Sequence, residues 1–224
     1  MERASLALVE TAYFEADMLC VKALEAALRA REFERMARIC MPLQEARRQL
    51  RHEATDTGRV TLISAPFPAK FDPKPGCFLV CPPIVGVEAR AVRERLARKK
   101  VPAMVLCREP TTKSGQWPVV AVGPDSEAWH MSPVVRVRVE APENGTPDCA
   151  WLLRAQEALG DAAIAKVKPS WPADHRVEDL LEYLDAVPDH EKLAQALESA
   201  CREAAVAPAS VSPRRRGVDD PYSF

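Results

Sequence analysis

Glycine and histidine are scarce in this chain, and their scarcity argues against several common kinds of site. The 224 residues include 8 glycines, 20 prolines and 4 histidines. Neither G-x-G-x-x-G nor G-x-x-x-x-G-K-[ST] occurs, so both common phosphate-binding loops are missing. The histidines form no pairing motif for a metal ion, and no G-x-S-x-G surrounds a candidate nucleophile. We therefore expect no cofactor and no metal ion.

The chain also lacks an excess of either charge and any long apolar run. Its formal net charge is -1, so nothing in the overall charge favours nucleic acid or an anionic membrane as a partner. No apolar run approaches the ~20 residues that a membrane helix needs. The N-terminal stretch carries acidic residues within its apolar part, unlike a signal peptide. We expect neither a nucleic-acid nor a membrane partner.

Cysteine is present in an odd number and without a regular spacing. The seven cysteines are scattered, and three of them lie in short apolar runs that are typical of strands. A disulfide framework would show an even number at framework-like spacings. Reduced, buried thiols are typical of a cytoplasmic protein, which is the location we expect.

The stretch from Cys77 to Pro110 organises the predicted fold. Residues 77–81 and 103–107 are apolar at every position, as in strands that are covered on both faces. Between them, residues 87–100 alternate apolar and charged positions at helical spacing. Two apolar strands joined by an amphipathic helix predict a right-handed crossover with parallel strands.

Further elements surround this unit and predict an α/β fold. The fold has a small, mostly parallel sheet of about five strands, with an N-terminal helical hairpin and C-terminal helices. The charges that alternate with valines 135, 137 and 139 indicate an edge strand with one wet face. The other predicted elements are helices Ser5–Arg29, Glu32–His52, Asp148–Lys166, Val177–Ala186 and Asp189–Val206, and strands Val60–Ile63 and Val119–Val122.

Four segments are predicted along the chain. Residues 1–55 form the helical hairpin, residues 59–167 the α/β core domain and residues 168–206 the C-terminal helices. The composition of residues 207–224 shifts to alanine, serine, proline and arginine, which predicts a disordered tail.

A candidate pocket lies at the carboxyl ends of the two central strands. Ligands of open α/β sheets bind beyond these ends. Cys81 and Cys107 end the strands, and Arg108, Glu109 and Lys113 follow the second one. A nucleophilic thiol needs an electropositive, partly open setting. The alternative interpretation is that each cysteine is a small apolar residue closing a buried strand.

The C-terminal tail carries a second candidate site. Asp219, Asp220, Tyr222 and Phe224 follow an arginine cluster, and the acids and terminal aromatic could dock in a basic groove with an apolar pocket. Over its last six residues the tail resembles the acidic tip of bacterial single-stranded-DNA-binding proteins, with Tyr-Ser inserted. The alternative is a solvated tail without a partner.

These observations favour a non-catalytic cytoplasmic interaction or regulatory protein. A protein partner would bind through the helical faces or the tail. The alternative is a small-molecule-binding protein or a thiol-dependent enzyme, with its site around Cys81 and Cys107.

Overall fold

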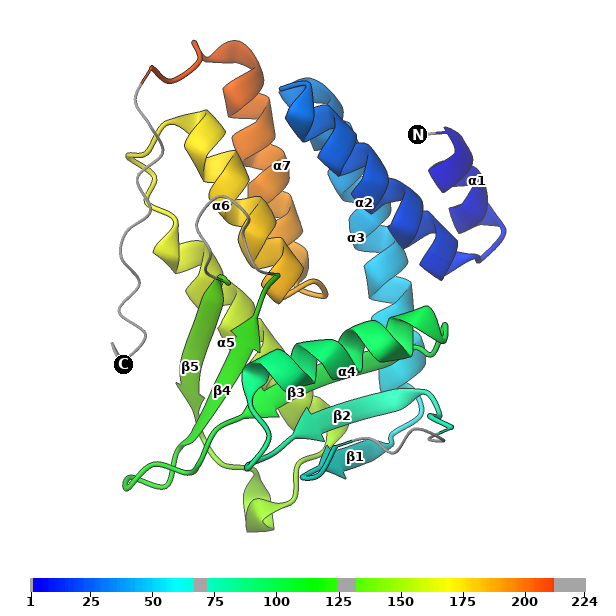
Figure 1. The fold of residues 1–224 in the computed structure, drawn as a ribbon, viewed down its shortest axis with the longest axis vertical. Coiled ribbons are helices and arrows are strands. Elements are labelled where there is room, and N and C mark those ends of the chain that lie inside the picture. The colour runs from blue at the N-terminus through cyan, green and yellow to red at the C-terminus, as the bar shows by residue number, and fades with distance from the viewer. Residues whose placement is uncertain (1, 67–71, 125–131, 212–224) are drawn as a thin grey trace.

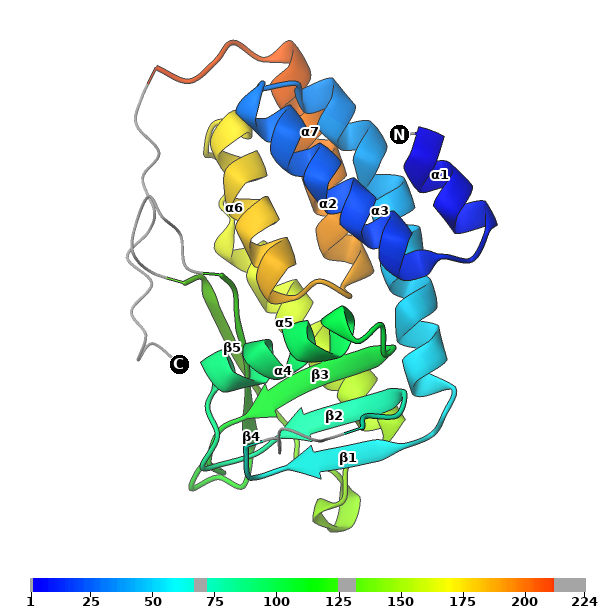
Figure 2. The ribbon, with the colours of Figure 1, turned by 45° about the vertical axis from the view of Figure 1, so that its right-hand side comes forward.

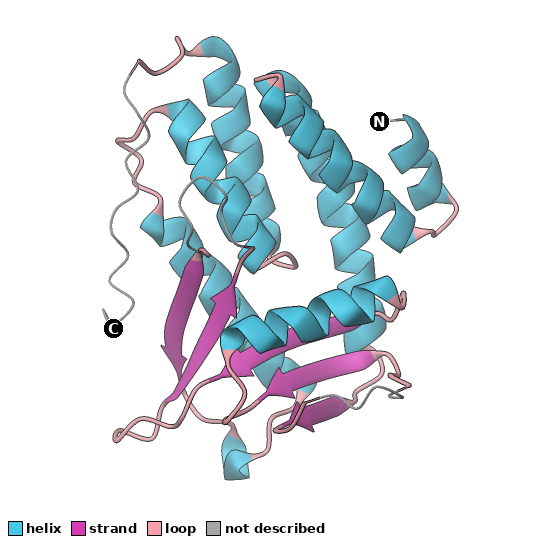
Figure 3. Ribbon diagram, in the orientation of Figure 1, coloured by secondary structure: helices cyan, strands magenta, loops and turns pink. Residues whose placement is uncertain are grey.

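The computed structural model describes residues 2–66, 72–124 and 132–211 of the chain. A group of helices lies at one end of the molecule and a sheet with its covering helices at the other (Figures 1 and 3). The helices are α1 (Glu2–Val9), α2 (Tyr13–Arg29), α3 (Phe33–Thr55), α4 (Gly86–Arg98), α5 (Cys149–Lys166), α6 (Ala173–Ala186) and α7 (Glu191–Val206), with a short 3-10 turn at Glu143–Gly145. The strands are β1 (Val60–Ile63), β2 (Gly76–Val80), β3 (Ala103–Arg108), β4 (Trp117–Val122) and β5 (Val134–Val139).

The five strands form one sheet in the order β1-β2-β3-β4-β5. The first three run parallel to one another, and β4 is antiparallel to both β3 and β5, so β4 alone runs against the others. The predicted α/β fold is confirmed, and the valine–arginine strand β5 lies at an edge, where its charged positions avoid burial.

The central crossover forms as the apolar pattern predicts. Every residue of β2 is buried, with Phe78 and Val80 in the core under α4 and Leu79 in the core on the other face. Helix α4 begins where the Glu88 carboxylate accepts a hydrogen bond from the Val85 N–H at 3.0 Å. Figure 2 shows α4 on one face of the sheet and α5 on the opposite face.

Helix α5 is anchored at its first turn. The Asp148 carboxylate accepts from the Trp151 N–H at 2.6 Å, so Asp148 is the N-cap of the helix. The Trp151 indole donates to the Glu140 carbonyl at 2.9 Å and meets the Trp117 ring edge-on. The helix therefore starts directly behind β4 and β5.

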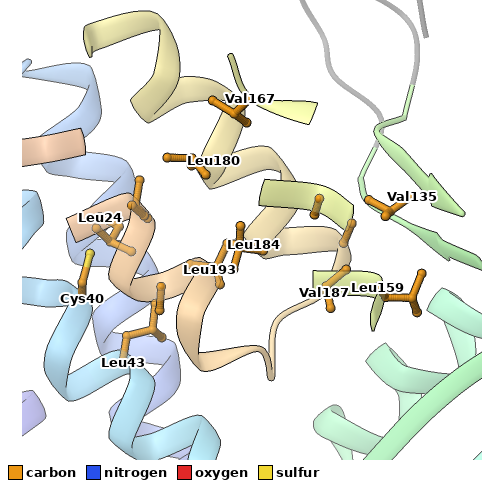
Figure 4. Close-up of a cluster of buried hydrophobic side chains, with 14 of the residues drawn as sticks. Leu24, Cys40, Leu43, Val135, Leu159, Val167, Leu180, Leu184, Val187 and Leu193 are labelled. Carbon is orange, nitrogen blue, oxygen red and sulfur yellow. The ribbon is translucent and has the colours of Figure 1, made fainter. Parts of the chain in front are cut away.

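The second group of helices shares its core with the sheet. Figure 4 shows Leu24 and Leu43 of the N-terminal hairpin facing Leu193 of α7, with Val135 of β5 at the far side of the same cluster. This cluster draws on the first three predicted segments, and their division into domains stays a prediction. None of the described helices has the length and apolarity needed to cross a membrane.

The prediction of one long helix from Ser5 to Arg29 is wrong. Helix α1 ends at Val9, Thr11 adopts a left-handed backbone with φ 56°, and α2 starts at Tyr13. The Ala12 N–H bonds the Ala7 carbonyl at 2.8 Å, as in a Schellman ending. The break between α1 and α2 could not be predicted from the sequence, because the usual signal is a glycine at this position and the residue here is threonine.

Candidate functional site

The two strand-end thiols lie where the sequence placed them, but they are buried. Val80 pairs with Cys107 across β2 and β3, so Cys81 and Cys107 sit at the carboxyl ends of neighbouring parallel strands. Cys107 is 1% exposed, and burial, with a smaller contribution from Glu109, raises the pKa of its thiol to about 12. A thiol in this state is protonated at neutral pH, which favours the structural alternative.

The polar residues after β3 do not converge on these thiols. Arg108 stacks over the Trp117 ring at 4.4 Å, and Glu109 accepts two hydrogen bonds of 2.7 Å from Arg136. Lys113 is exposed in the following loop. The predicted group of five is therefore dispersed.

A pocket of about 460 Å³ does lie at this end of the sheet. Its walls include Pro82, Pro83, Pro110 and Pro118, and Glu109 alone of the five predicted residues lines it. Glu109 is paired with Arg136, and apart from Glu109, Thr112 and Arg138 the wall of the pocket is apolar.

A charged cleft lies at the opposite end of β3. This cleft, of about 340 Å³, is walled by α4 and the start of β3 on one side and by α2, α3 and the α6–α7 link on the other. Figures 1 and 2 show these helices facing α4 across the junction of the two halves of the molecule. Sites for small molecules are frequent at such junctions.

Arginines from α3 and α4 hold the α6–α7 link against the cleft. Arg93 donates to the carbonyls of Asp185 and Ala186 at 2.7 and 2.8 Å, and Arg51 donates to the carbonyl of Asp189 at 2.7 Å. Cationic side chains at the last carbonyls of a helix satisfy acceptors that have no partner within the helix. These contacts bind the end of α6 to both halves of the molecule.

Two carboxylates in the cleft, unlike these carbonyls, have no hydrogen-bond donor among the described residues. The side chains of Asp185 and Asp189 accept no hydrogen bond from any residue that the structure describes. Burial raises the pKa of both carboxyls, although Arg47 and Arg93 act in the opposite direction. Each carboxylate therefore pays a desolvation cost that its surroundings do not fully offset.

The charges of the cleft leave an excess of negative charge. Arg47 bonds Asp17 at 2.7 Å, and Arg90 bonds Glu94 at 2.8 Å, so these two pairs are neutral. The remaining charges on the walls are Arg93, Asp185 and Asp189. The lining holds four acids against three arginines, and this formal excess of one negative charge suits a ligand with a positive group.

Glu157, Asp161 and His190 form a second cluster whose donor atoms would allow a metal ion by distance alone. The His190 Nδ1 accepts from the Leu193 N–H at 3.1 Å, so the neutral ring carries its proton on Nε2. That Nε2 faces the two carboxylates at 3.4 and 3.5 Å, and the Lys192 ammonium lies at 3.3 and 3.2 Å from them. The Lys192 ammonium already neutralises part of the negative charge of the two carboxylates, which disfavours a metal ion.

A wider groove, of about 870 Å³, lies at the far end of the helices between the α2–α3 turn and the end of α7. It contains three arginines and three acids, which pair as Arg31–Asp174, Arg35–Glu32 and Arg38–Glu34. These pairs leave no charge excess to select a ligand.

The candidate docking residues of the tail, Asp219, Asp220, Tyr222 and Phe224, lie outside the described residues. The apolar faces of the hairpin are used in the shared core, with Leu24, Met36 and Leu43 all buried. Docking of a partner through the tail stays a prediction.

No protein-family model, curated protein or solved structure matches this chain.

Proposed function

We propose that this protein is a non-catalytic regulatory protein that binds a small molecule in the charged cleft between α4 and the helices α2 and α3. The observation that carries the proposal is the pair Asp185 and Asp189, two half-buried carboxylates without a hydrogen-bond donor in the described chain. Partial burial raises the pKa of both carboxyls, and carboxyl groups with shifted pKa values that line a cleft are candidates for a functional site.

The arginines of the cleft stabilise the fold through backbone carbonyls and donate no hydrogen bond to the carboxylates of Asp185 and Asp189. Arg93 binds the last backbone carbonyls of α6 and Arg51 binds that of Asp189 in the α6–α7 link, and any residue type would provide these carbonyls. Asparagine or serine in place of Asp185 or Asp189 would leave those contacts in place. The carboxylates are thus available for a ligand while the arginines hold the wall.

A thiol-dependent reaction is the weaker alternative. Six of the seven cysteines are buried, and Cys107 in particular has its pKa raised to about 12. The strand-end pocket nearby is lined by prolines and by Glu109, without either thiol. Binding without chemistry is the function that this arrangement favours.

Regulation follows from the position of the cleft. One wall belongs to α4 and β3 and the other to α2, α3 and the α6–α7 link, so a bound molecule contacts both halves at once. Binding then stabilises the arrangement in which the two walls face each other, and this state is the signal that a partner can read.

The test compares how well small molecules are retained by the unmodified protein and by a variant whose cleft is filled by a tryptophan side chain. Ala97 is exposed and lines the cleft, whereas Ala91 is exposed on the same helix outside it. The full chain, Ala97→Trp and Ala91→Trp are dialysed against one defined mixture of small metabolites, and bound molecules are identified by mass spectrometry.

We expect the full chain and Ala91→Trp to retain the same molecule and Ala97→Trp to lose it. Equal melting temperatures of the two variants show that the tryptophan acts by filling space. Retention by Ala97→Trp, or no retention by the full chain, would overturn the proposal.

A further inference from the structure

A narrow slot opens from the cleft into the sheet. The slot, of about 30 Å³, shares Arg90, Arg93, Pro188 and Asp189 with the wider cleft. It enters between β3 and β4, which pair only at Cys107–Val120 and Arg108–Val119. The two strands separate beyond this point, and the slot occupies the separation.

The wall of the slot includes a buried side chain that has no hydrogen-bond partner among the described residues. Gln156 of α5 is 2% exposed and lines the slot. Neither its Oε1 nor its Nε2 has a hydrogen-bond partner in the described chain. A buried amide without a partner destabilises the fold, and a hydrogen-bond donor in the slot would offset the part of that cost that belongs to Oε1. 

We propose that the slot binds the primary ammonium group of an amine whose apolar body lies in the cleft, with Gln156 and Asp189 accepting its hydrogen bonds. This inference rests on the proposed function and names the class of ligand. Both acceptors line the slot, and an ammonium group supplies three donors and a positive charge.

The size and charge of the slot select this group. A volume of about 30 Å³ holds one group of the size of water or ammonium and is too small for a trimethylammonium group. The nearby arginines do not compete for the acceptors, because Arg93 donates to two backbone carbonyls and Arg90 donates to Glu94 and the Gly123 carbonyl. The excess negative charge of the cleft favours the amine over an anion of the same shape.

The body of the amine is expected to be apolar and compact. Phe14, Val21, Leu50 and Leu96 line the wider cleft. An aromatic ring or short alkyl chain attached to the ammonium would bury its surface against them.

Three probes with one body test the inference on the full chain. They are phenethylamine, its N,N,N-trimethylated ammonium and 3-phenylpropionate, and calorimetry at neutral pH measures their affinities. We expect phenethylamine to bind at least about ten-fold more tightly than the trimethylated probe, because only the primary ammonium fits the slot and donates there. The carboxylate probe is expected to bind more weakly than either.

Gln156→Leu separates ligand recognition from structural support. Leucine removes the two unpartnered polar atoms at nearly constant size, so the melting temperature is expected to hold or rise. The affinity for phenethylamine should fall about ten-fold or more, while that for the trimethylated probe stays constant. Gln49→Leu is the control, because Gln49 bonds Glu45 outside the cleft.

Equal affinities for the primary and trimethylated probes would overturn the inference, as would unchanged binding of phenethylamine to Gln156→Leu. Absence of binding by phenethylamine would also overturn it. If 3-phenylpropionate binds instead and Ala97→Trp abolishes that binding, the inference fails while the proposed function stands. If no small molecule is retained by the full chain, both fail.

Discussion

Cys107 and Asp189 show at the scale of single residues how burial decides chemistry. Burial disfavours the charged form of both side chains and raises the pKa of each. The result for Cys107 is an inert thiol at the end of a strand. Nearby arginines favour the charged form of Asp189, and Asp189 lines the cleft, so its carboxylate can still bind a cation.

Cysteine labelling checks the state of the thiols. Cys149 is the half-buried cysteine, and the other six are buried. We expect one fast equivalent on treatment with iodoacetamide at neutral pH, assigned to Cys149, with Cys107 and the rest reacting only in denaturant.

Cys149→Ser is the control and should remove the fast phase. Fast alkylation of Cys107 in the folded protein would contradict burial of its thiol and would restore the thiol-dependent alternative.

At the scale of elements, the scarcity of glycine has a visible consequence at helix ends. Thr11, Arg31 and Lys100 each have a φ near +55° where glycine is the usual residue. In each case the next residue donates to a carbonyl of the preceding helix, as Val101 does to Leu96 at 3.0 Å. The left-handed backbone costs each side chain free energy that glycine would avoid.

Thr11→Gly is therefore expected to stabilise the protein by about 0.5–1 kcal/mol, since the turn is kept and the steric cost of the side chain is removed. Glu10→Gly is the matched control. Its N–H still belongs to the last turn of α1, bonding Leu6 at 3.0 Å, so glycine there should destabilise by a similar amount. Unfolding in urea measures both differences, and destabilisation by Thr11→Gly would refute the strained position.

At the scale of the whole molecule, the hairpin is part of one shared core. Met36 and Ile39 of α3 are fully buried in the same cluster as Leu193 and Leu197 of α7. Helix α3 also reaches β2 and β3. Residues 1–55 therefore cover apolar surface of the sheet and of α7.

Deleting residues 1–55 is expected to abolish cooperative unfolding. Each large apolar side chain that loses its cover costs about 1.5–3 kcal/mol, and a few of them exceed the 5–15 kcal/mol that stabilises an ordinary domain. Deleting residues 1–11 is the control, because α1 buries only Ala4 and Ala7. Circular dichroism during heating compares the two forms; an unchanged melting temperature for the longer deletion would contradict the covering role.

The pattern of residues along the chain determined the central crossover, the charged edge strand and the Asp148 cap. Each depends on neighbours in sequence: apolar runs bounded by proline, valines alternating with charges, or a carboxylate three residues before the amide that it accepts from. Local physics is sufficient for such elements.

The tertiary structure alone decided the position of the candidate site. The sequence argument placed it at the carboxyl ends of β2 and β3, whereas the charged cleft lies at the amino end of β3. Its residues come from α2, α3, α4 and the α6–α7 link, and no spacing along the chain joins Asp17, Arg47, Arg93 and Asp189. The role of Gln156 could not be predicted from the sequence either, because the slot that it lines exists only where β3 separates from β4. The helices bring these groups together by packing their apolar faces, and the charges on the remaining faces meet as a consequence.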